Sequence, residues 1–183
     1  MSSRKTIGLA GLAIFLFIAV LYFMKNMVYI NSEERGVVPS AYEESGHRPE
    51  PLEPGWHLLR IGEKAVIYNL EPQTYVMPNV TNTDDSIRSR TSDGQEVFVD
   101  ASVTYRINPD TLLQLHINWH NRYEDSLVRP AARSFIRDVI SQYTFFEITT
   151  KRPEVEKAIF NLLNNFLMEN YLILEKFTIQ DIH

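Results

Sequence analysis

The chain has 183 residues, 44% of them hydrophobic and 22% charged, which is enough for one domain core and too apolar for wholesale disorder. It has no cysteine, which excludes disulfides, thiolate nucleophiles and cysteine-based zinc sites. Residues 1–25 contain three basic and no acidic side chains, whereas the rest contain 15 basic and 23 acidic ones; this net charge of −8 argues against nucleic-acid binding.

Residues 6–24 form an uncharged, apolar stretch whose 19 residues span about 29 Å as a helix, close to the thickness of a bilayer core. We predict an uncleaved transmembrane anchor, because the stretch is long for a signal peptide and no small-residue cleavage pattern follows it. A cleaved signal peptide and a buried core helix are the alternatives. Residues assigned to the anchor include Thr6, Ile7, Leu16, Phe17, Leu21, Tyr22, Phe23 and Met24.

The charges beside this stretch predict its orientation. Arg4 and Lys5 precede it, and Lys25 is the nearby cation that follows it. Because positive charge is retained in the cytoplasm, we expect residues 1–5 to be cytoplasmic. The domain that follows is then expected outside the cytoplasm, in the periplasm, the extracellular space or a mitochondrial intermembrane space.

The first half of the remaining chain predicts mostly strands. Residues 27–38 predict two short strands around a polar turn at residues 31–34, and residues 55–59 and 65–70 predict two more. Residues 39–54 contain four prolines and predict a surface loop. Asp93-Gly94 predicts a hairpin whose second strand, residues 97–107, alternates apolar and polar side chains, so that one face enters a core.

Helices are predicted next. Asn108 is expected to cap a short helix that begins at Pro109 and ends near Trp119. Asn121 and Glu124 have the spacing of a capping box for a second helix.

Apolar residues at helical spacing predict the buried stripes of the second and third helices. Pro130 predicts a kink or break in the second helix, and Pro153 is tolerated in the first turn of the third, which is expected to start at Thr149 or Thr150. A last strand over residues 173–182 completes an α+β domain with helices on one side. The stripes are Val128, Ala131, Phe135 and Val139, and then Val155, Ile159, Leu162 and Phe166, widened by Leu163 and Leu167.

Candidate chemistry is sparse. His116 and His120 have a spacing that two metal ligands can use, but Ile117 stands where a metalloprotease motif needs glutamate. We therefore interpret the two histidines as residues of a helix end or of an interface. Adjacent acids such as Glu33/Glu34 and Glu43/Glu44 are expected to be solvated. We predict no catalytic, cofactor-binding or metal-binding residue, and hence no enzyme.

Arginines of the second helix are the candidate protein contacts. Arg129, Arg133 and Arg137 lie largely off its apolar stripe. They either form a solvated face or pair with an acidic neighbouring protomer, and the surplus of acidic side chains makes such a partner surface available.

Several stretches follow one another in a characteristic order and spacing. They are ERGVV (34–38), LEPGWH (52–57), RTSDGQEV (90–97), VTYRI (103–107), VRPAARS (128–134) and LEKF (174–177) before Asp181-Ile182. Together they resemble the prohibitin branch of the SPFH (band 7) superfamily. The resemblance implies an SPFH domain over residues 27–183, with a curved, mostly antiparallel sheet and about three helices on one side. A long charged coiled-coil helix usually follows in the family and would begin at His183. Either the chain is a truncated piece of a longer protein, or it is a short member whose assembly is weakened.

The resemblance also implies a function. Members assemble into membrane rings or cages, so the expected partners are the bilayer, further copies or a paralogue, and a membrane-bound AAA protease. Our hypothesis is a single-span oligomeric scaffold that organises membrane microdomains or regulates such a protease. The alternatives are a monomeric membrane-tethered binding module, with a sheet edge that takes a peptide, and a membrane-tethered hydrolase.

Overall fold

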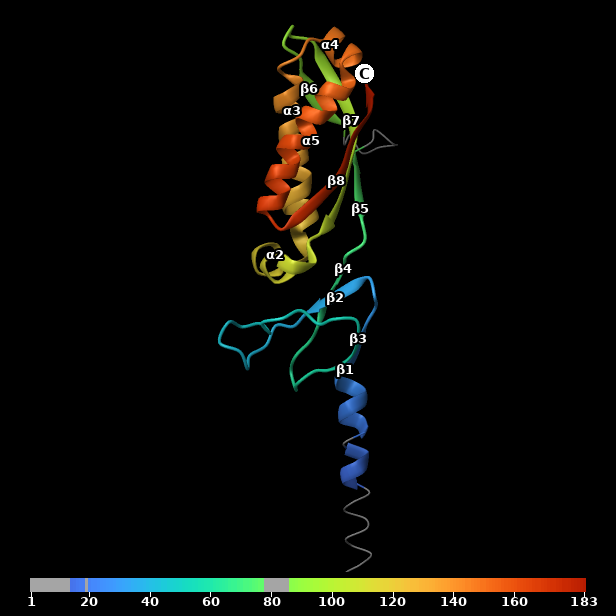
Figure 1. Cartoon of the computed structure of the whole chain (residues 1–183), viewed down its shortest axis with the longest axis vertical. Coiled ribbons are helices and arrows are strands. Elements are labelled where there is room, and N and C mark those ends of the chain that lie inside the picture. Colours follow the sequence, from blue (N-terminus) through green and yellow to red (C-terminus); the bar gives the residue numbers. More distant parts are fainter. Residues whose placement is uncertain (1–13, 19, 78–85) are drawn as a thin grey trace, which may run out of the picture. The chain divides into compact units, whose positions relative to one another are not determined.

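In the computed structural model the chain divides into two units, Met1–Asn69 and Leu70–His183 (Figure 1). The structure describes residues 14–18, 20–77 and 86–183. Residues 14–18 and 20–26 are helical, whereas Thr6 and Ile7 of the predicted anchor lie outside the described residues. Within the described ranges, no helix combines the length and the apolar character needed to cross a bilayer.

Two short antiparallel ladders form the first unit. Strand β1 (Met27–Ile30) pairs with β3 (Gly55–Leu58), and β2 (Glu34–Val37) pairs with β4 (Val66–Asn69). The strands predicted in these segments are confirmed. Each pairs with a segment distant in sequence, because the loop at residues 39–54 separates the two halves of the unit.

A small core holds the two ladders together. Ile30, Val38, Leu52 and Leu59 are buried in it. Gly36 lies where a Cβ atom would come within 3.2 Å of the Ile30 side chain and 3.3 Å of the Leu52 side chain. The glycine therefore lets β2 approach the segment around Leu52, with which it forms an isolated bridge.

The second unit is built around one long strand. Strand β7 (Glu96–Ile107) pairs antiparallel with β5 (Gln73–Met77), β6 (Ile87–Arg90) and β8 (Leu172–Ile182). Since β8 overlaps both other partners along β7, β5 and β6 share one edge of β7 and β8 occupies the other. The predicted β6–β7 hairpin and the final strand are confirmed, and β5 was not predicted.

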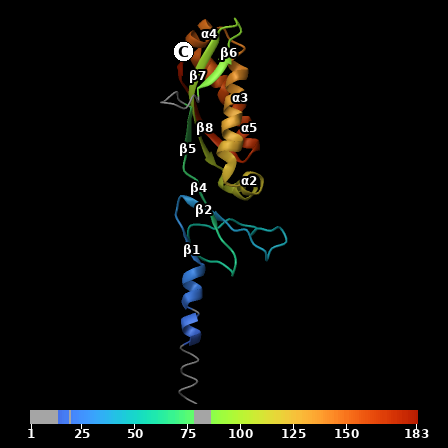
Figure 2. The same cartoon turned by 180° about the vertical axis from the view of Figure 1, so that it is seen from behind.

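Burial alternates along β7 as predicted. Its residues from Val97 to Ile107 are buried at every odd position and half-buried at every even one. The helices α3 (Arg129–Ile140) and α5 (Arg152–Glu169) lie on one side of the sheet in both views (Figures 1 and 2). The unit is therefore a mixed α+β fold whose helices cover one face of the sheet, while the side chains of β7 on the other face are half-buried.

The helical part contains seven segments. Asn108 caps the first, because its Oδ1 accepts from the Asp110 amide at 3.2 Å. Pro130 lies in the first turn of α3, directly after a π-helical segment, which confirms the predicted break. The segments are η1 (Pro109–Thr111), α2 (Leu112–Trp119), η2 (His120–Arg122), η3 (Glu124–Val128), α3 (Arg129–Ile140), α4 (Phe145–Thr150) and α5 (Arg152–Glu169).

The capping box predicted at Asn121 and Glu124 is wrong. Asn121 lies inside η2, and no side chain caps η3. The Glu124 carboxylate instead accepts from the buried Tyr105 hydroxyl at 2.6 Å. Burial, reinforced by this hydrogen bond, raises the pKa of Tyr105, so the phenol remains the donor.

The predicted start of the third helix is also wrong. Thr149 and Thr150 end α4, a helix that was not predicted, and α5 begins after Lys151. A capping box does form one helix earlier: the Thr144 hydroxyl accepts from the Glu147 amide, and the Glu147 carboxylate accepts from the Thr144 amide.

Two predicted stripes need correction. On α5 the buried row is Val155, Ile159, Leu163 and Leu167. These residues are spaced four apart and define the side of α5 that faces the core. Leu162 lies off this row and is 42% exposed. Phe135 and Phe166 are half-buried and meet edge to face at 5.6 Å, while Ile136 takes the buried position expected of Phe135.

Candidate functional site

Strands β1 and β3 carry an exposed apolar face. Val28 and Ile30 point toward the small core of the first unit, so the alternate residues of β1 point outward. Tyr29 lies opposite Trp56 with ring centroids 5.1 Å apart, and Met27 lies opposite Leu58. Trp56 is 67% exposed and Tyr29 50%. These four side chains, Met27, Tyr29, Trp56 and Leu58, are called the apolar face below.

The helical residues 14–18 and 20–26 lead directly into this face. β1 starts at the residue after the helix, and the Leu59 amide donates to the Asn26 carbonyl at 2.8 Å, so β3 is tied to the helix end. Ile61, 69% exposed, joins Ile18, Leu21 and Met24 in lining a groove of about 720 Å³. Exposed apolar side chains therefore continue from the helix to β1, β3 and Ile61.

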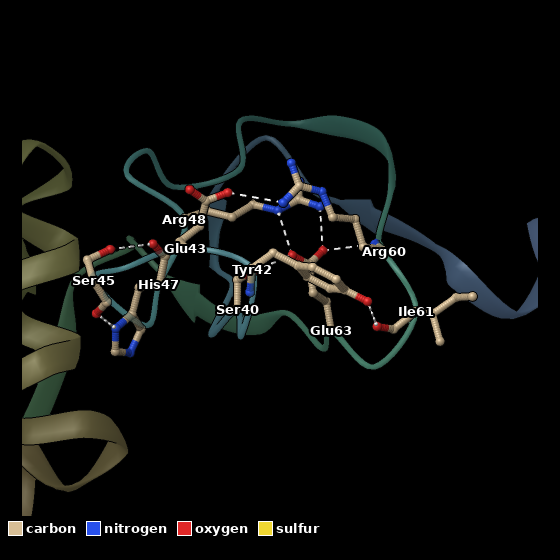
Figure 3. A network of polar contacts seen from close by, with 9 residues as sticks. All are labelled: Ser40, Tyr42, Glu43, Ser45, His47, Arg48, Arg60, Ile61 and Glu63. Carbon is tan, nitrogen blue, oxygen red and sulfur yellow. Dashed lines mark hydrogen bonds and ion pairs between the residues drawn. The ribbon is translucent and has the colours of Figure 1, made fainter.

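A buried carboxylate holds the turn that presents Ile61 (Figure 3). The Glu63 side chain is 1% exposed and accepts from Ser40 Oγ at 2.6 Å, Arg48 Nη2 at 2.5 Å and the Arg60 amide at 2.8 Å. Burial by itself raises the pKa of Glu63, but these hydrogen bonds and the Arg48 charge outweigh it and lower the pKa to about 2. The Glu63 carboxylate is thus ionised, and both of its oxygens accept hydrogen bonds.

Further contacts extend this network to the proline-rich loop. The Tyr42 hydroxyl donates to the Ile61 carbonyl at 2.9 Å, and Arg60 stacks over the Tyr42 ring at 5.5 Å (Figure 3). Arg60 also pairs with Glu43 at 3.1 Å, so Glu43 is not merely solvated as expected. The network joins the two loops of the first unit and fixes Ile61 beside the helix end.

Sequence reasoning missed the apolar face and the Glu63 network. Each joins residues that are distant in the sequence: Tyr29 and Trp56 lie 27 positions apart, and Arg48 and Glu63 lie 15 apart. The outward alternation of Met27 and Tyr29 in a short strand was the available signal. No local pattern marks Glu63 as buried.

The arginines predicted as protomer contacts are spread along α3. Arg129 lies over the Tyr75 ring of β5 at 5.9 Å, and Arg133 is half-buried. Arg137 is exposed, and its Nε donates to the Arg88 carbonyl of β6 at 3.2 Å. Their role between protomers stays a prediction.

The two helical histidines stack on each other, with ring centroids 5.0 Å apart. His116 is buried and His120 is exposed in a left-handed conformation. Neither shares a group with two further potential metal ligands within the described ranges. Such a group does exist at Asp100, Asp181 and His183, but two of its members are exposed and Asp100 accepts from Ser86, so we treat it as acidic surface.

A comparison with curated proteins found no match. A family model described as "SPFH domain / Band 7 family" matches residues 28–183, which include every strand and helix from β1 to β8 except the first residue of β1. This match covers most of the chain and agrees with the sequence resemblance and the mixed α+β fold. The chain therefore belongs to the SPFH domain / Band 7 family.

Proposed function

We propose that the protein is a membrane-anchored oligomeric scaffold without enzymatic activity, which organises its membrane surroundings or restrains a membrane-bound AAA protease. The main support for this proposal is the exposed apolar surface of the first unit. It begins on the helical residues 14–18 and 20–26 and continues over the apolar face and Ile61. Exposed apolar surface of this extent is a feature of interaction sites. Tyr and Trp at its far end are the residues that favour the bilayer interface.

The proposed mechanism is tethering. Residues 6–24 would cross the bilayer, Lys25 would reach the headgroups, and Tyr29 and Trp56 would lie at the interfacial level. The Glu63 network would keep Ile61 and the proline-rich loop in one conformation against the lipid. Copies held at one height meet at high effective concentration, so weak lateral contacts are enough for assembly.

Depth-dependent quenching of tryptophan tests the membrane contact. The chain has two tryptophans, so Trp119→Phe leaves Trp56 as the single reporter. In vesicles that contain brominated lipids, we expect the Trp56 emission to be quenched and shifted to the blue. The matched variant Trp56→Phe reports from Trp119, which is half-buried on α2 and is not part of the apolar face, so its quenching should be far weaker. Equal, weak quenching of both reporters would contradict the proposal.

Thiol labelling tests the proposed orientation. Ala41 is exposed in the proline-rich loop, and the chain has no other cysteine, so Ala41→Cys gives one reactive thiol. With the domain outside the cytoplasm, an impermeant maleimide should label this thiol in intact cells or spheroplasts. Labelling that appears only after lysis would invert the orientation while leaving the membrane contact intact.

The sheet edge bears on the alternative of a peptide-binding module. On β8, Arg152 Nη2 donates to the carbonyls of Ile179 and Gln180, and the Ile179 amide donates to Glu156 at 2.9 Å. Side chains of α5 thus already occupy backbone groups that an added strand would need. This supports the scaffold over a module that captures peptides along this part of β8.

A further inference from the structure

A basic hollow lies between β6 and α3 in the second unit. Its volume is about 470 Å³, and its charged lining consists of Arg88, Arg90, Arg137, Glu96 and Asp138. Arg88 pairs with Glu96, whereas Arg90 is exposed and has no ion-pair partner among the described residues. Three guanidinium groups thus gather at one place in a unit with 11 basic and 16 acidic side chains. Arg88, Arg90 and Arg137 are called the basic margin.

An acidic pair joins the central strand β7 to β8, the strand at the other edge of the same sheet. Asp100 of β7 and Asp181 of β8 are direct partners in the ladder, next to a register irregularity. Like charges placed opposite each other destabilise a strand pair. Ser86 donates to Asp100 at 2.7 Å, and His183 Nδ1 lies 3.6 Å from Asp181, but no lysine or arginine among the described residues pairs with either carboxylate. Asp100 and Asp181 are called the acidic margin.

The basic margin follows the β6 edge of the sheet, and Asp181 of the acidic margin lies on the β8 edge at the same end of β7. Val99 pairs with Ile87 of β6 on one side and with Ile182 of β8 on the other. Arg90 lies opposite Glu96, and Asp181 lies opposite Asp100, so these side chains lie on the same face of the sheet as the even-numbered residues of β7. A second copy placed beside the first in the same orientation brings its acidic margin to the basic margin.

We propose that the basic margin of one copy binds the acidic margin of the next copy. The contact is heterologous, because different surfaces meet, and repetition therefore closes into a ring or continues as a row. An arginine from the neighbour relieves the repulsion between Asp100 and Asp181, and the acidic side chains neutralise Arg90. The proposal rests on the scaffold function and names the surfaces that would join its copies.

A charge swap between two variants of the full chain in lipid vesicles tests this contact. Asp181→Arg places an arginine opposite Arg90 of the next copy, and Arg90→Glu places a glutamate opposite Asp181. Each variant alone should give about tenfold fewer multimers with a lysine-reactive cross-linker, because like charges across an interface are strongly unfavourable. Mixed one to one, the variants should regain the parental level, since each then meets an opposite charge. Multimers at the parental level in either single variant would overturn the proposal, as would a mixture that stays monomeric.

Controls separate this contact from folding and from the function it rests on. Arg122→Glu and Glu169→Arg make the same charge changes at exposed positions away from both margins and should leave cross-linking unchanged. Arg137→Glu is a second basic-margin variant and should reproduce Arg90→Glu if the latter misfolds by circular dichroism. A parent that stays monomeric at every surface density would refute the scaffold itself. A parent that cross-links while both reversals cross-link equally well would refute only this interface.

Discussion

Glu63 shows how a side chain in an ordinary loop becomes a structural centre. It lies between Gly62 and Lys64, a setting that predicts a solvated turn. In the folded chain its carboxylate accepts from Arg48, Ser40 and the Arg60 amide, and the first two lie 15 and 23 positions away. Sequence patterns report local periodicity, so partners at such separations are invisible to them.

Replacing this carboxylate should destabilise the first unit. Glu63→Gln leaves the mostly buried Arg48 without its counter-charge, so we expect a loss of about 2–3 kcal/mol in the free energy of unfolding. Urea unfolding followed by Trp56 emission in a Trp119→Phe background measures it. The matched control is Glu53→Gln, whose carboxylate pairs with Arg35 but is 72% exposed; it should cost under about 1 kcal/mol. Equal effects of the two variants would contradict the structural role of Glu63.

The same residue predicts a pH dependence. Folding lowers the pKa of Glu63 from the ordinary 4.5 to about 2. The ionised carboxylate therefore stabilises the folded state fully above pH 4.5, and this stabilisation is lost as the pH falls toward 2. The stability difference between the parent and Glu63→Gln should shrink across this interval. A difference that stays constant from pH 6 to pH 2.5 would show that Glu63 titrates normally in the folded chain.

Among the elements, those with strong local signals were predictable. The alternation of β7 and the Asp93-Gly94 turn are both local, and both are confirmed. β5 was missed because its five residues are specified by pairing with β7 rather than by their own pattern. α4 was missed although Thr144 and Glu147 have the spacing of a capping box, so a signal was present there.

The corrected face of α5 yields a prediction with a built-in control. Ile159 is fully buried, and its truncation to alanine should cost about 2–5 kcal/mol through lost burial and a cavity. Leu162 is 42% exposed on the same helix, so Leu162→Ala should cost under about 1 kcal/mol. Thermal unfolding followed by circular dichroism compares them. If Leu162→Ala lowered the stability more than Ile159→Ala, the buried stripe predicted from the sequence would be correct after all.

One threonine and one asparagine test which side chains cap the helices. Thr144→Ala removes the hydroxyl that caps α4 and should cost about 1 kcal/mol. Asn121→Ala removes a side chain that caps no helix and should change stability by less than about 0.5 kcal/mol. A clear loss from Asn121→Ala would instead indicate that the capping box forms in solution.

At the scale of the whole molecule, the sequence separated the apolar N-terminal stretch from the domain but could not locate the proposed membrane surface. Hydropathy marks residues 6–24 because they are contiguous. The apolar face combines Tyr29 with Trp56, which become neighbours when β1 pairs with β3. The margins of the second unit likewise depend on which strands flank β7. The family could therefore be predicted from the sequence, whereas the contact surfaces could not.

Assembly should depend on surface density rather than on bulk concentration. The lateral contact proposed here joins exposed charges, and such contacts are individually weak and screened by salt. Confinement in a membrane plane raises the effective concentration of neighbours and compensates for this weakness. The full chain should therefore be monomeric in nanodiscs that hold one copy. In vesicles it should cross-link into multimers whose yield rises with the protein-to-lipid ratio and falls between about 0.05 and 0.5 M salt. A yield that follows bulk protein concentration at constant surface density would contradict assembly by tethering.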